Sequence, residues 1–495
     1  MHIELKRHAG TPLSKQIAQT LSDRIRSGLL TAGTRLPSVR DLARTLKVSQ
    51  VTVSKAYAEL ERMELIHCAQ GKGCFVGPEP ESDDGATELA ASWQLSVVDY
   101  LPRAHTWRHF QGTSSGCRYR LHMAQVDPRL LPNQEICRNI HRIVTEDPSI
   151  IGSYGPFQGD AELRRVMSGY FRERGIDADA EELLITSGSQ QGIDLVARTF
   201  VGPGDTVYVE GPTYSGAIDV FAARGARVMT VPVDREGMRV DILSRLCDVH
   251  PPKLIYTIPT FHNPTGTVMS ASRRARLLEL AQSYNAIILE DDAFSDTYFR
   301  TEPPRPIKAM DRFGHVILIK GFSKIVSPGC RISALMASGS ILGRLIAAKT
   351  IADLGSPSLN QRAILPVLQS GLFQRHLKRL RAALKARRDL VLELLKRHAP
   401  KGVTWTEPEG GFNLWVTMPE WARATDLYLL AQREGVAILP GVACYANEPE
   451  LHRFRLSYSF MDEDALREAV TLLCGVMRRY LEHPSPGDAH PWPTM

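Results

Sequence analysis

The sequence predicts an α/β protein in which a large, mostly parallel sheet follows a separate, basic module of helices. Five short apolar runs alternate with helical patterns, which indicates parallel strands covered by helices on both faces. These runs lie at 182–186, 206–210, 254–258, 286–290 and 316–319. Residues 1–77 hold 12 basic and 6 acidic side chains, so the chain's whole net charge of +6 lies in them. At 495 residues the chain is too long for one ordinary domain.

Composition narrows the classes of protein to consider. Apolar residues make up 43% and charged residues 23% of the chain, which is ordinary for a globular protein. No apolar run reaches the ~20 residues that a membrane span needs, and residues 1–7 lack the apolar stretch of a secretion signal. The 8 cysteines include no C-x-x-C pair, which argues against a zinc site and against a disulfide framework. We therefore expect a cytoplasmic protein with no metal and no membrane partner.

The pattern of residues 11–77 predicts three helices and a hairpin. Thr11 and Pro12 are typical of a helix start, and the apolar face that follows is Leu13, Ile17, Leu21 and Ile25. Ser38 with Asp41 resembles a capping box for a second helix, and Ser49 caps a third. The expected buried residues are Val39, Leu42, Ala43 and Leu46 in the second helix, and Val53, Ala56, Tyr57 and Leu60 in the third. Strands at 66–70 and 74–76, joined across 71–73, complete a winged helix-turn-helix.

This module resembles the GntR family of bacterial regulators over its whole length. The matching residues are Gly-Thr-Arg-Leu-Pro-Ser-Val-Arg-Asp-Leu-Ala at 33–43, Val-Ser at 48–49 and Thr-Val-Ser-Lys-Ala-Tyr at 52–57. The resemblance implies binding of double-stranded DNA, with candidate contacts at Arg35, Arg40, Ser49, Gln50, Thr52, Lys55 and the wing residue Lys72. The family usually has arginine at the position of Gln50, and glutamine can recognise adenine instead. The alternative is an interaction module that binds no DNA.

The segment that follows is predicted to be a linker. Residues 78–92 are acidic, contain proline and are poor in apolar residues, which is typical of a tether, whereas 93–110 are more apolar. We expect the winged helix at 1–77, the linker at 78–118, a large domain at 119–482 and a tail at 483–495.

Lys324 is the residue that points most directly to a cofactor. The apolar run 316–319 delivers it to the carboxyl end of a strand, where Ser323 precedes it and Arg331 follows. A desolvated lysine near other cations has a lowered pKa and can form a Schiff base with an aldehyde, while serine and arginine can hold a phosphate. An aldehyde and a phosphate on one small molecule describe pyridoxal 5'-phosphate.

Polar or aromatic groups follow every other strand of the predicted sheet as well. Ligands of such sheets bind beyond the carboxyl ends of the strands. Ser189 and Gln190 open a helix that can bind an anion, Tyr214 can stack on a planar ring, and Asn263 can face a ring oxygen. Asp291 follows the fourth run, and a buried carboxylate there would keep a pyridine nitrogen protonated.

Together these motifs resemble the fold-type I pyridoxal-phosphate enzymes, the aspartate aminotransferase superfamily, from about residue 119 to 480. The resemblance implies a mostly parallel sheet of about seven strands with helices on both faces and a smaller C-terminal α+β subdomain. It assigns the covalent cofactor bond to Lys324 and the pyridine nitrogen to Asp291. The other implied cofactor contacts are Asn263, Tyr214, Ser189, Gln190, Ser323, Arg331 and Tyr154, which reaches into a partner subunit. Arg455 is implied to bind the substrate's α-carboxylate.

Two positions depart from the superfamily's pattern. A tyrosine usually follows the aspartate and donates to the ring oxygen, but this chain has Ala293 and Phe294 there. Gly321 stands where a serine or threonine often donates to the phosphate. The basic stretch 376–396 could suggest nucleic-acid binding, but its leucines recur at helical spacing, which favours a solvated connecting helix.

The two halves together resemble the MocR (GabR-like) regulators. The resemblance implies a domain-swapped homodimer that binds DNA and senses pyridoxal phosphate or an amino acid or amine effector. One alternative is a working aminotransferase of the aromatic or 2-aminoadipate type with an accessory DNA-binding module. Another is a regulator whose large domain is a dimerisation scaffold that holds no cofactor.

Overall fold

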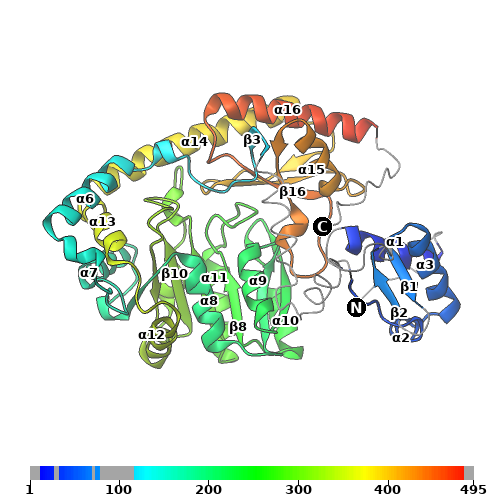
Figure 1. The fold of residues 1–495 in the computed structure, drawn as a ribbon, viewed down its shortest axis with the longest axis horizontal. Helices are drawn as coiled ribbons and strands as arrows, with labels where there is room; N and C mark the ends of the chain where they lie inside the picture. Colours follow the sequence, from blue (N-terminus) through cyan, green and yellow to red (C-terminus); the bar gives the residue numbers. More distant parts are fainter. Residues whose placement is uncertain (1–11, 27–29, 31–32, 70–72, 78–115, 484–495) are drawn as a thin grey trace, which may run out of the picture. The chain divides into compact units, whose positions relative to one another are not determined.

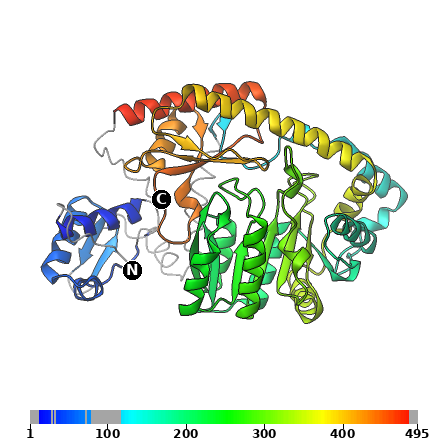
Figure 2. The same ribbon diagram turned by 180° about the vertical axis from the view of Figure 1, so that it is seen from behind.

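The computed structural model describes residues 12–26, 30, 33–69, 73–77 and 116–483. The chain divides into two compact units, one containing the N-terminal helices and the other comprising His109–Ser485. Figure 1 and Figure 2 show both units from opposite sides, and each is described by itself below. The residues predicted to form most of the linker and the C-terminal tail lie outside the described residues, so the four predicted domain limits stay predictions. Among the described residues, none of the helices is both long and apolar enough to cross a membrane.

The N-terminal unit is a three-helix winged helix, as the sequence predicts. Its helices are α1 (Leu13–Arg26), α2 (Val39–Leu46) and α3 (Gln50–Arg62), and its hairpin strands are β1 (Ile66–Ala69) and β2 (Gly73–Val76). Ser38 and Ser49 cap α2 and α3 through their side chains, which confirms both predicted caps. The predicted apolar faces meet in one core that includes Ile17, Leu21, Leu42, Leu46, Val53, Ala56, Tyr57, Leu60, Ile66 and Val76.

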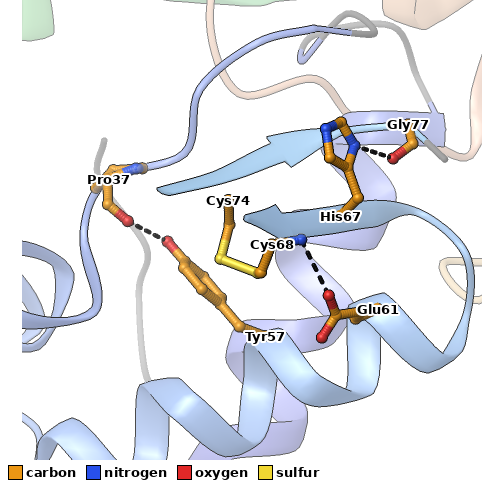
Figure 3. Close-up of a disulfide and its surroundings, with 7 residues drawn as sticks. All are labelled: Pro37, Tyr57, Glu61, His67, Cys68, Cys74 and Gly77. Atoms are coloured by element: carbon orange, nitrogen blue, oxygen red, sulfur yellow. Dashed lines mark hydrogen bonds between the residues drawn. A yellow bond between two sulfur atoms is a disulfide. The ribbon is translucent and has the colours of Figure 1, made fainter. Parts of the chain in front are cut away.

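The hairpin corrects one conclusion drawn from the sequence. Cys68 and Cys74 form a disulfide, although the spacing of the cysteines argues against such bonds (Figure 3). The predicted strand limits place a turn at 71–73, which would set Cys74 opposite Gln70. The observed register instead pairs Cys68 with Cys74 and Ala69 with Gly73. A small error in register therefore hides the pairing, because directly opposed residues are the ones whose side chains meet.

A mostly parallel sheet of 8 strands forms the centre of the large unit, in the order β4-β11-β10-β9-β8-β5-β6-β7. Strands β10, β9, β8, β5 and β6 pair in parallel, while β11 runs antiparallel to both neighbours and β7 is a two-residue addition at the edge. The strands are β4 (Leu183–Thr186), β5 (Thr206–Gly211), β6 (Arg227–Asp234), β7 (Gly237–Met238), β8 (Leu254–Thr257), β9 (Ile287–Asp292), β10 (Val316–Gly321) and β11 (Ser333–Met336). The sequence predicts five of these and misses β6, β7 and β11.

Helices cover both faces of this sheet because side chains alternate along each strand. Val207 and Val209 pack with α8 (Ser189–Phe200), α9 (Ser215–Ala223) and α12 (Gly339–Asp353), whereas Tyr208 packs with α10 (Val240–Val249) and α11 (Ala271–Ser283) on the opposite face. At the other end of the sheet, Leu318 lies on the same face as Tyr208 and packs with α7 (Ala161–Arg172), α13 (Ser358–Gln369) and α14 (Leu372–His398). Helix α6 (Asn133–Glu146) packs against α13.

A smaller α+β subdomain completes the large unit, as the resemblance implies. Its sheet has the order β12-β13-β16-β15. The elements are β12 (Thr404–Trp405), β13 (Asn413–Thr417), β14 (Val436–Ala437), β15 (Leu439–Pro440), β16 (Arg453–Ser457), α15 (Ala424–Arg433) and α16 (Glu463–Glu482), and β14 pairs with β3 (Tyr119–Arg120). Figure 1 shows α14, the long yellow helix, running from the large sheet to the subdomain, where it packs against α16. The basic stretch 376–396 is thus a connecting helix with leucines on its buried side.

Candidate functional site

The first turns of α3 form an exposed face of the winged helix. Ser49 Oγ accepts a hydrogen bond from Thr52 N–H at 3.1 Å and lies 2.8 Å from Thr52 Oγ1. Gln50 and Lys55 are exposed, and Val51 is 63% exposed. The first turn holds no acidic residue, so the positive end of the helix dipole and several polar side chains face solvent together. Such a face is chemically suited to a polyanion, and Val51 adds a methyl surface that thymine can contact.

Two predicted arginines belong to the same unit. Arg40 is exposed in the first turn of α2, and Arg35 is exposed beside the hairpin, where it forms a bridge with Phe75. A Cβ atom added to Gly73 would lie 3.0 Å from Arg35 Nε, so the guanidinium lies against the hairpin. Lys72 lies outside the described residues. The role of these side chains in DNA binding stays a prediction.

Lys324 lies just beyond the carboxyl end of β10, as the sequence predicts. Its Nζ donates to the Ala124 carbonyl at 2.6 Å. Burial, followed by the positive charges of Arg455 and Arg331, lowers the pKa of Lys324 to about 8. Far more of this amine is therefore neutral near physiological pH than of an ordinary lysine, and only the neutral form is a nucleophile.

Asp291 is buried at the end of β9, inside the strand rather than after it as the sequence suggests. Its Oδ2 accepts from Tyr256 Oη at 2.8 Å, but its buried Oδ1 has no hydrogen-bond partner among the described residues. Burial is the main cause that raises the pKa of Asp291 to about 6. A buried carboxylate oxygen without a donor is costly, so this site fits a ligand that brings a positively charged N–H. A protonated pyridine ring is such a ligand.

The start of α8 and the segment after β10 form a possible anion site. Gly188 caps α8 with a φ of 81°, and a Cβ added there would collide with Arg331 Nη2, so only glycine leaves room for the guanidinium. Arg331 donates long hydrogen bonds from Nη1 to Ser323 Oγ at 3.4 Å and from Nη2 to the Ser187 carbonyl at 3.5 Å. Backbone N–H groups, a hydroxyl and an arginine thus converge as phosphate binding requires.

Gly321, one of the two departures, has a structural explanation. A Cβ added to it would lie 2.7 Å from Ser189 Oγ. The hydroxyl of Ser189 therefore occupies the space that a serine or threonine at 321 would need. The other departure has a different consequence: Phe294 is buried against Phe412, with ring centroids 5.1 Å apart, so its ring belongs to the core.

The remaining residues predicted to bind the cofactor and substrate are partly joined by hydrogen bonds. Tyr214 Oη donates to Gln190 Oε1 at 2.9 Å, and burial raises the pKa of Tyr214 to about 12. Arg455 on β16 donates from Nη1 to Asn263 Oδ1 at 2.9 Å, while its buried Nε has no partner in the part of the chain that the structure describes. The oxygen of Asn263 is therefore engaged, and its amide nitrogen is the atom that can donate to a ring oxygen. Tyr154 is not buried with this group, since it is 86% exposed.

Sequence patterns do not reveal two buried polar groups on the strands that carry this site. Tyr256 holds Asp291 from within an apolar strand run. Lys320, fully buried on β10, lies 3.1 Å from Asp292 Oδ2 and 2.8 Å from Asp296 Oδ2. Tyr256 lies inside an apolar run and Lys320 directly follows one, and in both cases the partner is distant in the sequence. The register pairs Lys320 with Asp292 and Ile319 with Asp291, so the ion pair and Asp291 point to opposite faces.

Comparisons with known proteins bear on both units. Residues 13–76 match the gntR family of bacterial regulatory proteins, and residues 123–473 match the aminotransferase class I and II family. The chain is 32% identical over 479 residues to an uncharacterized HTH-type transcriptional regulator, YisV, of Bacillus subtilis (strain 168), covering 96% of this chain and 98% of the relative. It is 27% identical over 475 residues to the probable rhizopine catabolism regulatory protein MocR of Rhizobium meliloti, covering 95% and 94%.

A solved structure is also similar. It is LysN, an alpha-aminoadipate aminotransferase from Thermus thermophilus, complexed with N-(5'-phosphopyridoxyl)-L-leucine. The TM-score is 0.74 and the identity 32%, over 79% of this chain and 99% of that chain.

Proposed function

The chain belongs to the aminotransferase class I and II family and joins it to a GntR-family module, as the MocR-type transcriptional regulators do, and from this we propose that it controls DNA binding through an amine sensed at Lys324. The observation that carries the proposal is that one chain holds both an exposed, acid-free start of α3 and a strand-end cluster around Lys324 and Asp291. Pyridoxal phosphate is the cofactor that this cluster fits.

The side chains around Lys324 divide the work of holding that cofactor and its ligand. When bound, pyridoxal phosphate supplies an aldehyde that reacts with amines and a ring that withdraws electrons. Lys324 would supply an amine whose lowered pKa leaves more of it neutral than in an ordinary lysine, and Asp291 would pair with the ring nitrogen. Arg331 with the start of α8 binds the phosphate, and Arg455 orients a carboxylate. The matching effector class is therefore amino acids or other amines.

An effector changes DNA binding only if it binds the two conformations of the protein with different affinity. Coupling free energies of this kind are typically about 1–3 kcal/mol, or roughly 5- to 150-fold in affinity. An amine that competes with Lys324 for the aldehyde alters the contacts of that lysine and of Ala124, which lies in a different segment from β10. This supports a coupling that begins at Lys324.

The DNA-binding half of the proposal is tested by Arg40→Ala. We expect weaker binding of all duplex sequences and a salt slope of log affinity reduced by about 1, because the proposal assigns Arg40 to a phosphate rather than to a base. Fluorescence anisotropy over a series of salt concentrations measures both. Arg62→Ala is the matched control, because Arg62 lies in the last turn of α3 and pairs with Glu59. An unchanged slope for Arg40→Ala would remove Arg40 from the interface.

The partner that completes the site is proposed to be a second copy of the chain, in a domain-swapped homodimer. Tyr154 and Ile351 are 86% and 87% exposed, and a Cβ added to Gly355 would lie 2.7 Å from the Gly155 carbonyl, so the segment that follows α12 contacts the loop that holds Tyr154. Ile151, Phe157 and Leu354 are also exposed apolar residues of these two segments, and we treat the five residues together as the proposed interface patch. Exposed patches of large apolar residues mark interaction surfaces, and Tyr154 would then reach the partner's phosphate site.

We expect Ile351→Asp to weaken this dimer by at least about 10-fold, because a charge at an apolar interface loses its hydration without gaining a partner. Sedimentation velocity over a concentration series measures the dissociation constant. Phe313→Asp is the control, since Phe313 is also apolar and 77% exposed but lies far along the chain from the patch. Equal dissociation constants for both variants would place the interface elsewhere.

A working aminotransferase remains the second candidate function. It is favoured by the presence of Lys324, Asp291, Arg331 and Arg455 in one chain and by the likeness to a solved aminotransferase. Steady-state turnover of an amino acid with 2-oxoglutarate separates it from a sensor. A scaffold without a cofactor is disfavoured by Oδ1 of Asp291, which none of the described residues satisfies and which a purely structural domain has no reason to keep.

A further inference from the structure

The hairpin of the N-terminal unit carries two cysteines that face each other. Cys68 on β1 lies opposite Cys74 on β2, with their Cα atoms 4.0 Å apart and their sulfurs bonded (Figure 3). Cys68 N–H donates to Glu61 Oε1 at 3.0 Å, and the Cys74 carbonyl accepts from Leu36 N–H at 2.8 Å. The backbones of Cys68 and Cys74 thus form hydrogen bonds with other segments rather than with each other. This identifies a non-hydrogen-bonded pair of the ladder, in which opposed side chains lie closest.

This pair differs from the other cysteines of the chain. Cys68 is exposed and Cys74 is partly buried, so a small reagent can reach the bond. All 8 cysteines lie in the described residues, and the remaining six form no disulfide, five of them being buried. Hairpin pairing alone therefore brings two accessible thiols together at this one place. Disulfides of proteins from reducing compartments are mostly transient or redox-sensing rather than structural.

We propose that Cys68 and Cys74 form a thiol–disulfide exchange site for low-molecular-weight thiols and disulfides, and that its state sets the order of the β1–β2 hairpin. In the reducing direction, a thiolate of the small thiol attacks one sulfur and displaces the other as a thiolate. A second small thiol then attacks the mixed disulfide. The protein gains two thiols, and one molecule of small disulfide leaves with the oxidising equivalents. In the oxidising direction the small disulfide is the oxidant and leaves as two thiols.

The bond lies between the last turn of α3 and the segment that carries Arg35. Cys68 is held by Glu61 of α3, and β2 supports Arg35 through Phe75 and Gly73. The sequence between the two cysteines contains Lys72, the predicted wing contact. A two-stranded hairpin is marginal without further support, and a crosslink across it removes open conformations. The oxidised protein is therefore the form whose hairpin is pre-organised for DNA, a consequence that rests on the proposed function.

The test uses the full-length protein in buffers that span a series of ratios of reduced to oxidised glutathione. Differential alkylation with mass spectrometry measures the state of Cys68 and Cys74, and hydrogen exchange measures protection of the amides at 66–69 and 73–76. Anisotropy measures binding of a fluorescein-labelled, mixed-sequence duplex at low salt. We expect one two-electron transition, slower hydrogen exchange in the oxidised form, and DNA binding tighter by about 3- to 10-fold, because a pre-organised hairpin loses less conformational freedom on binding.

Two variants separate the possible outcomes. Cys68→Ser with Cys74→Ser should bind DNA as the reduced protein does in every buffer, and Cys137→Ser, which removes the exposed free cysteine, should keep the full response. Three results would overturn the thiol–disulfide exchange site. They are a cysteine pair that stays in one redox state throughout, identical hydrogen exchange in both states, and a response that survives the double substitution. If hydrogen exchange depends on the redox state but the duplex binds in neither state, the thiol–disulfide exchange site is supported. The proposed DNA-binding function is then the part that is overturned.

Discussion

Lys324→Ala is expected to abolish covalent attachment of pyridoxal phosphate, because it removes the activated amine that β10 delivers to the site. The protein is incubated with the vitamer, treated with borohydride and analysed by mass spectrometry of its peptides. Wild-type protein should carry the adduct on Lys324 alone. Lys378→Ala, which changes an exposed lysine of α14, should label like the wild type. A stable adduct of similar yield in Lys324→Ala would place the reactive amine elsewhere.

The same labelling has a predicted pH dependence. The pKa of Lys324 is lowered to about 8, first by burial and then by Arg455 and Arg331. Only the neutral amine attacks the aldehyde, so the initial labelling rate should rise with pH and level off above a midpoint near 8. An ordinary lysine, with a pKa of about 10.4, would still be almost wholly protonated there. A midpoint near that ordinary value would show that the environment of Lys324 does not activate it.

The sequence predicts well that the proposed cofactor residues lie at strand ends, because parallel strands carry them to one edge of the sheet. Lys324, Asp291 and Asn263 each follow or end a run of apolar residues, and the topology of a parallel sheet then brings them together. The winged helix is predictable for a similar reason: its caps and apolar spacings are local signals. Neither prediction depends on knowing which strands pair with each other.

What the sequence does not predict depends on pairing between distant segments. β11 inserts antiparallel between β4 and β10, and nothing in its four residues shows where it lies. Tyr256 and Asp291 are 35 residues apart, and Lys320 and Asp292 are 28 apart. Such partners are fixed by sheet register, which apolar patterns do not determine when both faces of every strand are buried.

The buried ions around Lys320 are expected to be among the largest contributors to stability of any side chains in the large unit. Tyr170 Oη donates to Asp296 Oδ2 at 2.7 Å, and Arg174 pairs with Asp296 while its guanidinium lies 3.6 Å from the centroid of the Tyr170 ring. Burial alone would raise the pKa of Asp296, but Lys320 and Arg174 outweigh it and hold that pKa far below its usual range. Burial would lower the pKa of Lys320, but Asp292 and Asp296 outweigh it and raise that pKa.

The directions of these two pKa shifts set the pH range over which the ions stabilise the fold. Asp296 contributes above the ordinary carboxyl pKa of about 3.9, and this contribution is lost as the pH falls towards the folded value. Lys320 contributes below the ordinary lysine pKa of about 10.4, and its contribution is lost as the pH rises through the folded value. From about pH 5 to pH 9 both contributions are therefore complete, and the effect of a substitution should not depend on pH.

Lys320→Met is accordingly expected to lower the free energy of unfolding by about 3–5 kcal/mol, because it leaves two buried carboxylates with one fewer cation. Urea denaturation at a fixed protein concentration measures the loss. Lys385→Met is the matched control: Lys385 pairs with Asp389 on the surface of α14, and such pairs contribute about 1 kcal/mol or less. Adding Asp292→Asn to Lys320→Met should recover part of the loss, since it removes one of the unpaired charges. Equal losses for Lys320→Met and Lys385→Met would mean that the buried ions do not stabilise one another.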